Sequence, residues 1–284
     1  YHLRSFVAVA HTGNLTQAAK RLYTTPPAIS AHIKALEEEL STELFIRSSQ
    51  GMALTGKGKL LLTKAQLTLD NALDLVNSAA SNQHEIIGTF RLGINLSAAQ
   101  LRLAELIENI REDCPGISLE IEQQSTGKIL NDIRDNQLDG GYIYGDIPDD
   151  FIGVAVRAQQ ITTVAPLTFD KHKILTPTDL SQQRWIMMGD YCPFDEFLKV
   201  KLGSNTPSVL KTSDDGTRLL LVKSGLGLSF VEIEAAILAE QSKEVQIIPA
   251  LDFTTTLHFV VAKTRADEPV IKTLFQSVRG LWAS

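Results

Sequence analysis

The sequence predicts a small, mostly helical domain, then a long connecting helix and a larger α/β domain. Three patterns support this division. Apolar residues recur at intervals of three and four over the first 60 residues, no Pro or Gly interrupts residues 59–87, and short apolar runs alternate with helical patterns from residue 88 onward. The expected boundaries are therefore 1–58, 59–87 and 88–284.

Two short amphipathic helices are expected first. One presents a stripe of apolar residues and stops at Gly13, since glycine often ends a helix: Leu3, Phe6, Val7 and Ala10. The next has an apolar face at the same spacing, with two small residues that let another helix cross closely: Leu15, Ala18, Ala19 and Leu22.

A third helix follows the short connection at residues 23–24. Thr25 is a good N-cap, and Pro26 suits a first helical turn because its missing N–H is not needed there. The spacing turns one set of residues inward: Ile29, Ile33, Leu36 and Leu40. It turns a smaller and more polar set outward: Pro27, Ser30, Ala31 and Lys34. Two short strands, 44–46 and 52–54, then form a wing around residues 48–51.

Two helices joined by a tight turn, with small and polar groups exposed on the second, match helix-turn-helix geometry. The third helix would enter the major groove of double-stranded DNA, and Arg47 at the base of the wing would meet a phosphate or the minor groove. The expected contact set is Thr25, Pro26, Pro27, Ser30, Ala31, Lys34, Arg47 and Lys57. The pattern alone also allows an ordinary three-helix core with a solvated polar face.

The charge distribution favours DNA binding. Residues 1–65 carry eight Lys or Arg and four acids, a net charge of +4, whereas the whole chain has −6. The remaining residues therefore carry −10. A basic head on an acidic body is expected when only the head meets phosphate.

Residues 3 to about 62 resemble the winged helix-turn-helix of LysR-type transcriptional regulators. The matching residues are dense and in order: Phe6, Ala18-Ala19, Leu22, Pro27-Ala28-Ile29-Ser30, Ile33, Leu36-Glu37, Leu40, Leu44-Phe45, Arg47 and Leu54-Thr55. Three positions depart from the family pattern. The family commonly has Gln where this chain has Pro26, Gly where it has Ser41, and Ser where it has Asn14. The operator preference of relatives cannot be transferred, because that Gln often reaches DNA.

One helix is expected from the cap Thr55 to about Gln83. Its apolar residues follow a heptad pattern that favours pairing with a second copy: Leu62, Ala65, Leu69, Ala72, Val76 and Ala79. The alternative is packing on the chain's own larger domain. The resemblance implies that two copies of the chain pair through this helix as a homodimer. It also implies a homotetramer as a further expected assembly.

The strands and helices expected from residue 88, with strands at 227–231, 245–248 and 257–262 among them, indicate an α/β domain with largely parallel sheets. The resemblance covers this region more weakly, through residues 91–93, 114–119, 138–141 and 222–229. It implies an effector-binding domain of two lobes resembling periplasmic binding proteins. Lobe I would comprise 88–161 and 264–284, and lobe II 162–263, with two crossover strands between them.

Ligands of such sheets bind beyond the carboxyl ends of the strands. The expected effector-binding residues are Asn95, Ser97, Ser125, Thr126, Gly189, Tyr191, Thr212 and Ser213. Hydroxyls and free N–H groups at helix starts suit a carboxylate, although each Ser or Thr alone could be a simple cap. No Arg is found at an obvious cleft position, so a strong anion clamp is not expected there, and the effector's identity stays open.

The remaining features limit the function. The sequence shows no metal spacing, no cofactor fingerprint and no catalytic constellation, so an enzyme is not expected. No membrane span or signal peptide is recognised, which favours a cytoplasmic protein. RNA polymerase is a further expected partner of such a regulator. Two alternatives stay open. Cys192, near a helix start that would stabilise a thiolate, could sense redox state, or the chain could be a ligand-binding receptor without DNA function.

Overall fold

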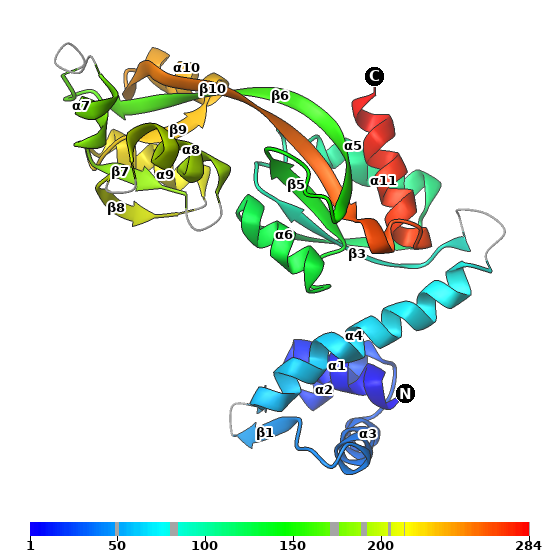
Figure 1. Cartoon of the computed structure of the whole chain (residues 1–284). Coiled ribbons are helices and arrows are strands. Elements are labelled where there is room, and N and C mark those ends of the chain that lie inside the picture. Colours follow the sequence, from blue (N-terminus) through cyan, green and yellow to red (C-terminus); the bar gives the residue numbers. More distant parts are fainter. Residues whose placement is uncertain are drawn as a thin grey trace. The chain divides into compact units, whose positions relative to one another are not determined.

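The computed structural model describes residues 1–48, 51–79, 85–170, 176–188, 192–203, 206–212 and 214–283. The chain divides into two compact units, Tyr1–Gly88 and Thr89–Ser284 (Figure 1). Each unit is described by itself.

Three helices form the body of the N-terminal unit: α1 His2–Thr12, α2 Leu15–Arg21 and α3 Pro26–Glu39. α1 ends at Gly13, which has the left-handed φ of 62° that glycine tolerates. The Asn14 side chain caps α2 by accepting two backbone N–H groups, and the Thr25 hydroxyl accepts the N–H of Ala28 at the start of α3. These observations confirm the expected helices, the stop at Gly13 and the cap at Thr25; the Asn14 cap was not expected from the sequence.

The apolar faces of these helices meet in one core. The two small residues of α2, Ala18 and Ala19, are at most 1 % exposed, and the inward residues of α3 are buried with them: Ile29, Ile33 and Leu36. Leu40 was wrongly expected to face inward. It is 43 % exposed because it lies one residue past the end of α3, where the helical direction no longer holds.

The wing consists of β1 Phe45–Ser48 and β2 Gly51–Leu54, an antiparallel pair in which Phe45 lies opposite Leu54. α4, Gly56–Asn77, starts at the expected cap, since the Thr55 hydroxyl accepts the N–H of Gly58 at 2.8 Å. The expected end near Gln83 is wrong, because the helix ends at Asn77; residues 80–84 lie outside the described part of the chain.

The C-terminal unit is built on a six-stranded sheet of order β4-β3-β5-β10-β6-β9. The strands are β3 Gly88–Ile94, β4 Ile117–Gln123, β5 Gly140–Tyr144, β6 Phe151–Pro166, β9 Ser229–Glu232 and β10 Val245–Ala262. β6 and β10 are long and antiparallel, and their pairing runs from Val245 opposite Pro166 to Ala262 opposite Phe151.

These two long strands run between two groups of elements (Figure 1). We call the first group lobe I; it holds β3–β5 with α5 Leu103–Asp113, α6 Thr126–Arg134 and the last helix, α11 Pro269–Trp282. Lobe II holds β9 with α7 Pro177–Ser181, α8 Pro193–Leu202, α9 Asp215–Lys223 and α10 Ile233–Gln241, and the parallel pair β7 Trp185–Met187 and β8 Ser208–Lys211. A short 3₁₀ helix, Lys263–Arg265, precedes α11.

Two expectations about this sheet are wrong. The sheet is not largely parallel, because β10 pairs antiparallel with both of its neighbours, β5 and β6. The expected strands 245–248 and 257–262 are one strand, in which the pairing with β6 shifts register between Ile248 and Phe253.

No helix in the described part of the chain has both the length and the apolar character that a membrane crossing requires.

Candidate DNA-binding face and ligand cavity

The outer face of α3 is exposed in the N-terminal unit. Pro27, Ala31 and Lys34 are exposed and Ser30 is partly so, on the side opposite the buried Ile29 and Ile33. Lys34 is 76 % exposed, and its ammonium lies 3.6 Å from the carboxylate of Glu38, one turn further along. An ion pair this exposed contributes little free energy, so the Lys34 ammonium can leave Glu38 and contact a phosphate.

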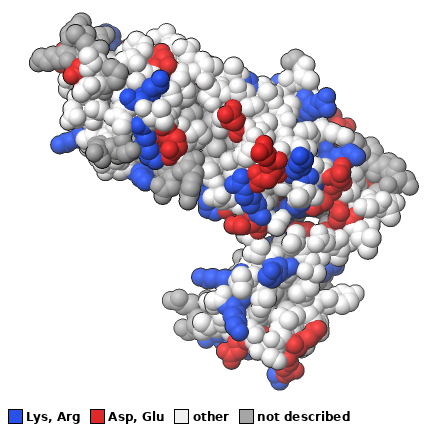
Figure 2. All heavy atoms as spheres, viewed as in Figure 1, with Lys and Arg blue, Asp and Glu red and all other residues white. Residues whose placement is uncertain are grey.

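The wing is joined to this face. Arg47 on β1 is exposed, and its guanidinium donates a hydrogen bond of 3.2 Å to the hydroxyl of Ser30. Of the other expected contact residues, Thr25 is exposed and Pro26 half-buried at the start of α3, whereas Lys57 is exposed in the first turn of α4. In Figure 2, basic side chains lie at several places on the visible face of this unit, most of which is uncharged, and acidic ones lie toward its lower edge.

The expected dimerisation seam of α4 falls into two halves. Ala65 is 5 % exposed and packs with Leu62 in the core of the N-terminal unit. Further along the helix Leu69 is half-buried, and Ala72 and Val76 are exposed. Ala79 is also exposed but lies past the end of α4 at Asn77. Only this later half therefore presents free apolar surface.

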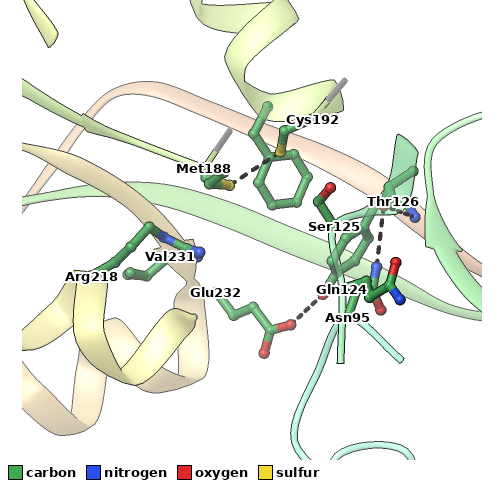
Figure 3. Close-up of a pocket in the computed structure, with 11 residues that line it drawn as sticks. Asn95, Gln124, Ser125, Thr126, Met188, Cys192, Arg218, Val231 and Glu232 are labelled. Atoms are coloured by element: carbon green, nitrogen blue, oxygen red, sulfur yellow. Dashed lines mark hydrogen bonds between the residues drawn. The ribbon is translucent and has the colours of Figure 1, made fainter. Parts of the chain in front are cut away.

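A cavity lies between the two lobes of the C-terminal unit (Figure 3). The empty space in and around it, including the part open to solvent, is about 430 Å³. The side from lobe I is polar: Asn95, Gln124, Ser125, Thr126 and Tyr144. The side from lobe II is mainly apolar with two charged residues: Met188, Cys192, Phe194, Val231, Arg218 and Glu232.

Close packing of α6 on the sheet places the polar side. A Cβ atom at Gly141 of β5 would lie 2.6 Å from Ile129 of α6, so glycine is needed for this approach. The start of α6 then lies at the ends of β3 and β5. The Thr126 hydroxyl there accepts the backbone N–H of Tyr144 at 3.1 Å and the side-chain amide of Asn95 at 3.3 Å.

Glu232 connects the two lobes across the cavity. It is the last residue of β9 and only 6 % exposed. Its carboxylate accepts hydrogen bonds from the Tyr144 hydroxyl and the Gln100 amide, both of lobe I. The guanidinium of Arg157 on β6 lies 3.9 Å away.

The structure places the expected effector residues in three groups. Asn95, Ser125 and Thr126 line the cavity. Ser97 and Thr212 do not: Ser97 is exposed and bonds Gln100, and the Thr212 hydroxyl accepts the N–H of Asp214 before α9. The remaining three lie outside the described residues: Gly189, Tyr191 and Ser213.

Arg218 and Glu232 are the charged lining residues that the sequence reasoning missed. The expectation that no Arg lies in the cleft is wrong, because Arg218 lines the cavity and is only 3 % exposed. The expectation that ligands bind beyond the carboxyl ends of strands could not identify Arg218, because it lies inside α9 rather than at a strand end. Glu232 is the first residue after the expected strand 227–231, so the search for ligand-binding residues at strand ends should have included it.

Cys192 also lines the cavity, as the N-cap of α8. Burial, with a smaller contribution from the charge of Asp195, raises the pKa of its thiol to about 11. The expectation of a stabilised thiolate is therefore wrong. Its sulfur lies 3.3 Å from that of Met188, and Cys114, the second cysteine, is also free and buried. Among the described residues no group of three or more His, Cys, Asp or Glu could hold a metal ion.

Comparisons with known proteins agree with this architecture. Residues 1–59 match the bacterial regulatory helix-turn-helix protein model of the lysR family, and residues 83–283 match the LysR substrate binding domain. A probable RuBisCO transcriptional regulator of Cyanidium caldarium is 28 % identical over 245 residues, covering 82 % of this chain and 77 % of that protein. The HTH-type transcriptional regulator YofA of Bacillus subtilis is 26 % identical over 248 residues, covering 86 % and 85 %.

Solved structures show the same fold over the whole chain. The probable transcriptional regulator PA0477 from Pseudomonas aeruginosa has a TM-score of 0.70 at 18 % identity and covers 98 % of this chain and 95 % of its own. A full-length OxyR variant from the same organism has a TM-score of 0.65 at 20 % identity, covering 98 % and 93 %. The expected resemblance and fold class are thus confirmed. The chain belongs to the LysR family of bacterial transcriptional regulators, which are not enzymes, and joins the family's helix-turn-helix to its substrate-binding domain.

Proposed function

We propose that this regulator binds a partly palindromic DNA site as a dimer and that a small molecule in the interlobe cavity controls this binding. The observation that carries the DNA part is the exposed face of α3 joined to the wing through the bond between Arg47 and Ser30. A helix whose buried face is filled and whose outer face is small, polar and basic suits the major groove.

The contact residues divide by role in this proposal. Ser30 would bond base edges, and Pro27 and Ala31 would touch thymine methyl groups. Lys34, Arg47 and Lys57 would neutralise phosphates, which gives affinity that falls steeply with salt. Thr25 and Pro26 fix the start of α3, where the positive end of the helix dipole also favours a phosphate.

Dimerisation would use the second half of the α4 seam. Leu62 and Ala65 are already occupied in the unit's own core, which leaves Leu69, Ala72 and Val76 for a partner. Small residues at such a seam allow two helices to approach closely. A tetramer, contact with RNA polymerase and a cytoplasmic location belong to the same proposal.

Effector control would act through the two lobes. A ligand that touches both walls of the cavity stabilises one arrangement of the two lobes, between which β6 and β10 run, and so shifts the equilibrium between arrangements with different DNA affinity. The thiol-sensing alternative is not favoured, since the buried Cys192 stays protonated at neutral pH.

The test measures DNA binding by fluorescence anisotropy at several salt concentrations. The probe is a duplex selected by the wild-type protein from a random-sequence pool. Arg47→Ala should weaken binding, because it removes a charge and the partner of Ser30. Arg111→Ala is the matched control, since Arg111 is an exposed arginine on α5 of the other unit. Equal affinity of both variants would contradict the assignment of the contact face.

A further inference from the structure

Two buried groups of opposite charge line the same cavity. Arg218 is 3 % exposed and Glu232 is 6 % exposed. In Figure 3, Arg218 lies on one side, and the Glu232 carboxylate points toward the side where Asn95 and Gln124 lie. A ligand that enters loses its own hydration, so any charge it carries must meet an opposite one inside.

The Glu232 side of the cavity is rich in hydrogen-bond acceptors. The side-chain oxygens of Asn95 and Gln124 are buried and bond to nothing among the described residues. The amide orientation of Gln124 is fixed, because its nitrogen donates to the carboxylate of Glu122 at 2.6 Å and its oxygen must lie on the other side. Two unpaired acceptors that line the same cavity as the Glu232 carboxylate call for a ligand with several N–H donors, and a protonated amine supplies three.

The other side of the cavity suits a negative group. Arg218 supplies the positive charge there, and guanidinium pairs well with a carboxylate. A purely anionic ligand would have to face Glu232, and a purely cationic one would have to face Arg218.

We infer that the effector is a zwitterion of the free amino acid class, with its ammonium group toward Glu232, Asn95 and Gln124 and its carboxylate toward Arg218. The inference rests on the proposed function, whose effector cavity it specifies. The apolar surfaces of Met188, Phe194 and Val231 leave room for an uncharged side chain.

The experiment uses the full-length protein. Each of the twenty protein L-amino acids is tested by thermal shift, and any that raises the melting temperature is measured by calorimetric titration. Each binder is compared with two matched compounds: the 2-hydroxy acid, which lacks the ammonium, and the decarboxylated amine. At least one amino acid should bind, and both matched compounds should bind at least about tenfold more weakly, the loss expected for one charge-assisted hydrogen bond. The inference falls if no amino acid binds or if either matched compound binds equally well.

A pair of variants locates the ammonium. Glu232→Gln should weaken amino acid binding at least about tenfold, because the negative charge is lost at nearly constant size. Glu234→Gln is the control: Glu234 lies two residues away, bonds Gln159 and does not line the cavity, so its affinity should match the wild type. Equal affinity of Glu232→Gln and the wild type would overturn the inference. The ligand comparison in the wild type decides the matter alone if Glu232→Gln fails to fold.

DNA binding of the same samples separates this inference from the proposed function. If the wild type binds DNA and a hydroxy acid or amine alone alters that binding, the proposed function stands and the zwitterion is wrong. If the wild type shows no salt-dependent DNA binding, the proposed function itself is wrong.

Discussion

Replacing Lys34 with alanine should weaken DNA binding while leaving the fold intact. The stability cost is small. The ammonium of Lys34 lies 3.6 Å from Glu38, an attraction of about 1 kcal/mol in water, and the two side chains are 76 % and 68 % exposed. Screening and side-chain entropy reduce such helix pairs to about 0.5 kcal/mol or less. The free energy of unfolding should therefore fall by no more than about 0.5 kcal/mol.

The effect on DNA binding should be much larger than this and should depend on salt. Each phosphate contact contributes about 0.9 to the slope of log K against log salt concentration. A dimer that loses both copies of Lys34 should show a slope shallower by about 1.8. The assay is anisotropy at five or more salt concentrations, beside a urea unfolding curve for each protein.

Lys272→Ala is the matched control for this prediction. Lys272 is an exposed lysine on α11 of the C-terminal unit, so the substitution makes the same charge change away from the contact face. Its affinity and slope should equal those of the wild type. A Lys34→Ala protein with unaltered slope would refute the placement of α3 against phosphate.

Three further predictions concern other parts of the molecule. Gly58→Ala should destabilise the N-terminal unit by about 1–3 kcal/mol in urea unfolding, because the new Cβ would lie 2.2 Å from the Leu44 carbonyl oxygen; an unchanged unfolding curve would contradict this. Ala65→Glu should unfold the same unit, because it buries an unpaired charge. Ala72→Glu should leave the unit folded and only weaken self-association in sedimentation equilibrium, because Ala72 is exposed. A folded Ala65→Glu protein beside an unfolded Ala72→Glu protein would be inconsistent with the division of the α4 seam. Alkylation of Cys192 by iodoacetamide, followed by mass spectrometry, should be slow at pH 8 and speed up until about pH 11, because its thiol keeps its proton below that value; a plateau below pH 8 would show an exposed thiolate instead.

The N-terminal unit could be predicted closely because its signals are local. α2, α3 and α4 each begin at a capping side chain, Asn14, Thr25 and Thr55, and the helices carry apolar stripes spaced within a few residues. The error at Leu40 came from extending such a stripe one residue past the last helical turn. Helix ends are not set by periodicity, so this kind of error is expected.

The central sheet could not be predicted in the same way, since strand pairing joins distant residues. The middle of β10 carries Pro249 and a register shift, which made one strand look like two in the sequence. The direction of β10 against β5 and β6 has no local signal at all. Only the lobe I wall of the cavity could be predicted, because its residues lie at strand ends that the sequence pattern locates. Asn95 of lobe I directly follows a strand and could be identified in this way, whereas Arg218 lies within a helix of lobe II.

The path of the chain through the C-terminal unit has a consequence for its synthesis. Lobe I begins with β3, yet it needs the end of β10 to pair with β5 and α11 to pack on α5, and these are the last elements of the chain. The DNA-binding head can fold as soon as it leaves the ribosome, because its core is formed by residues early in the sequence. The ligand-sensing part stays incomplete until translation is almost finished. A nascent chain stalled before residue 245 would therefore carry a folded head without a completed sensor.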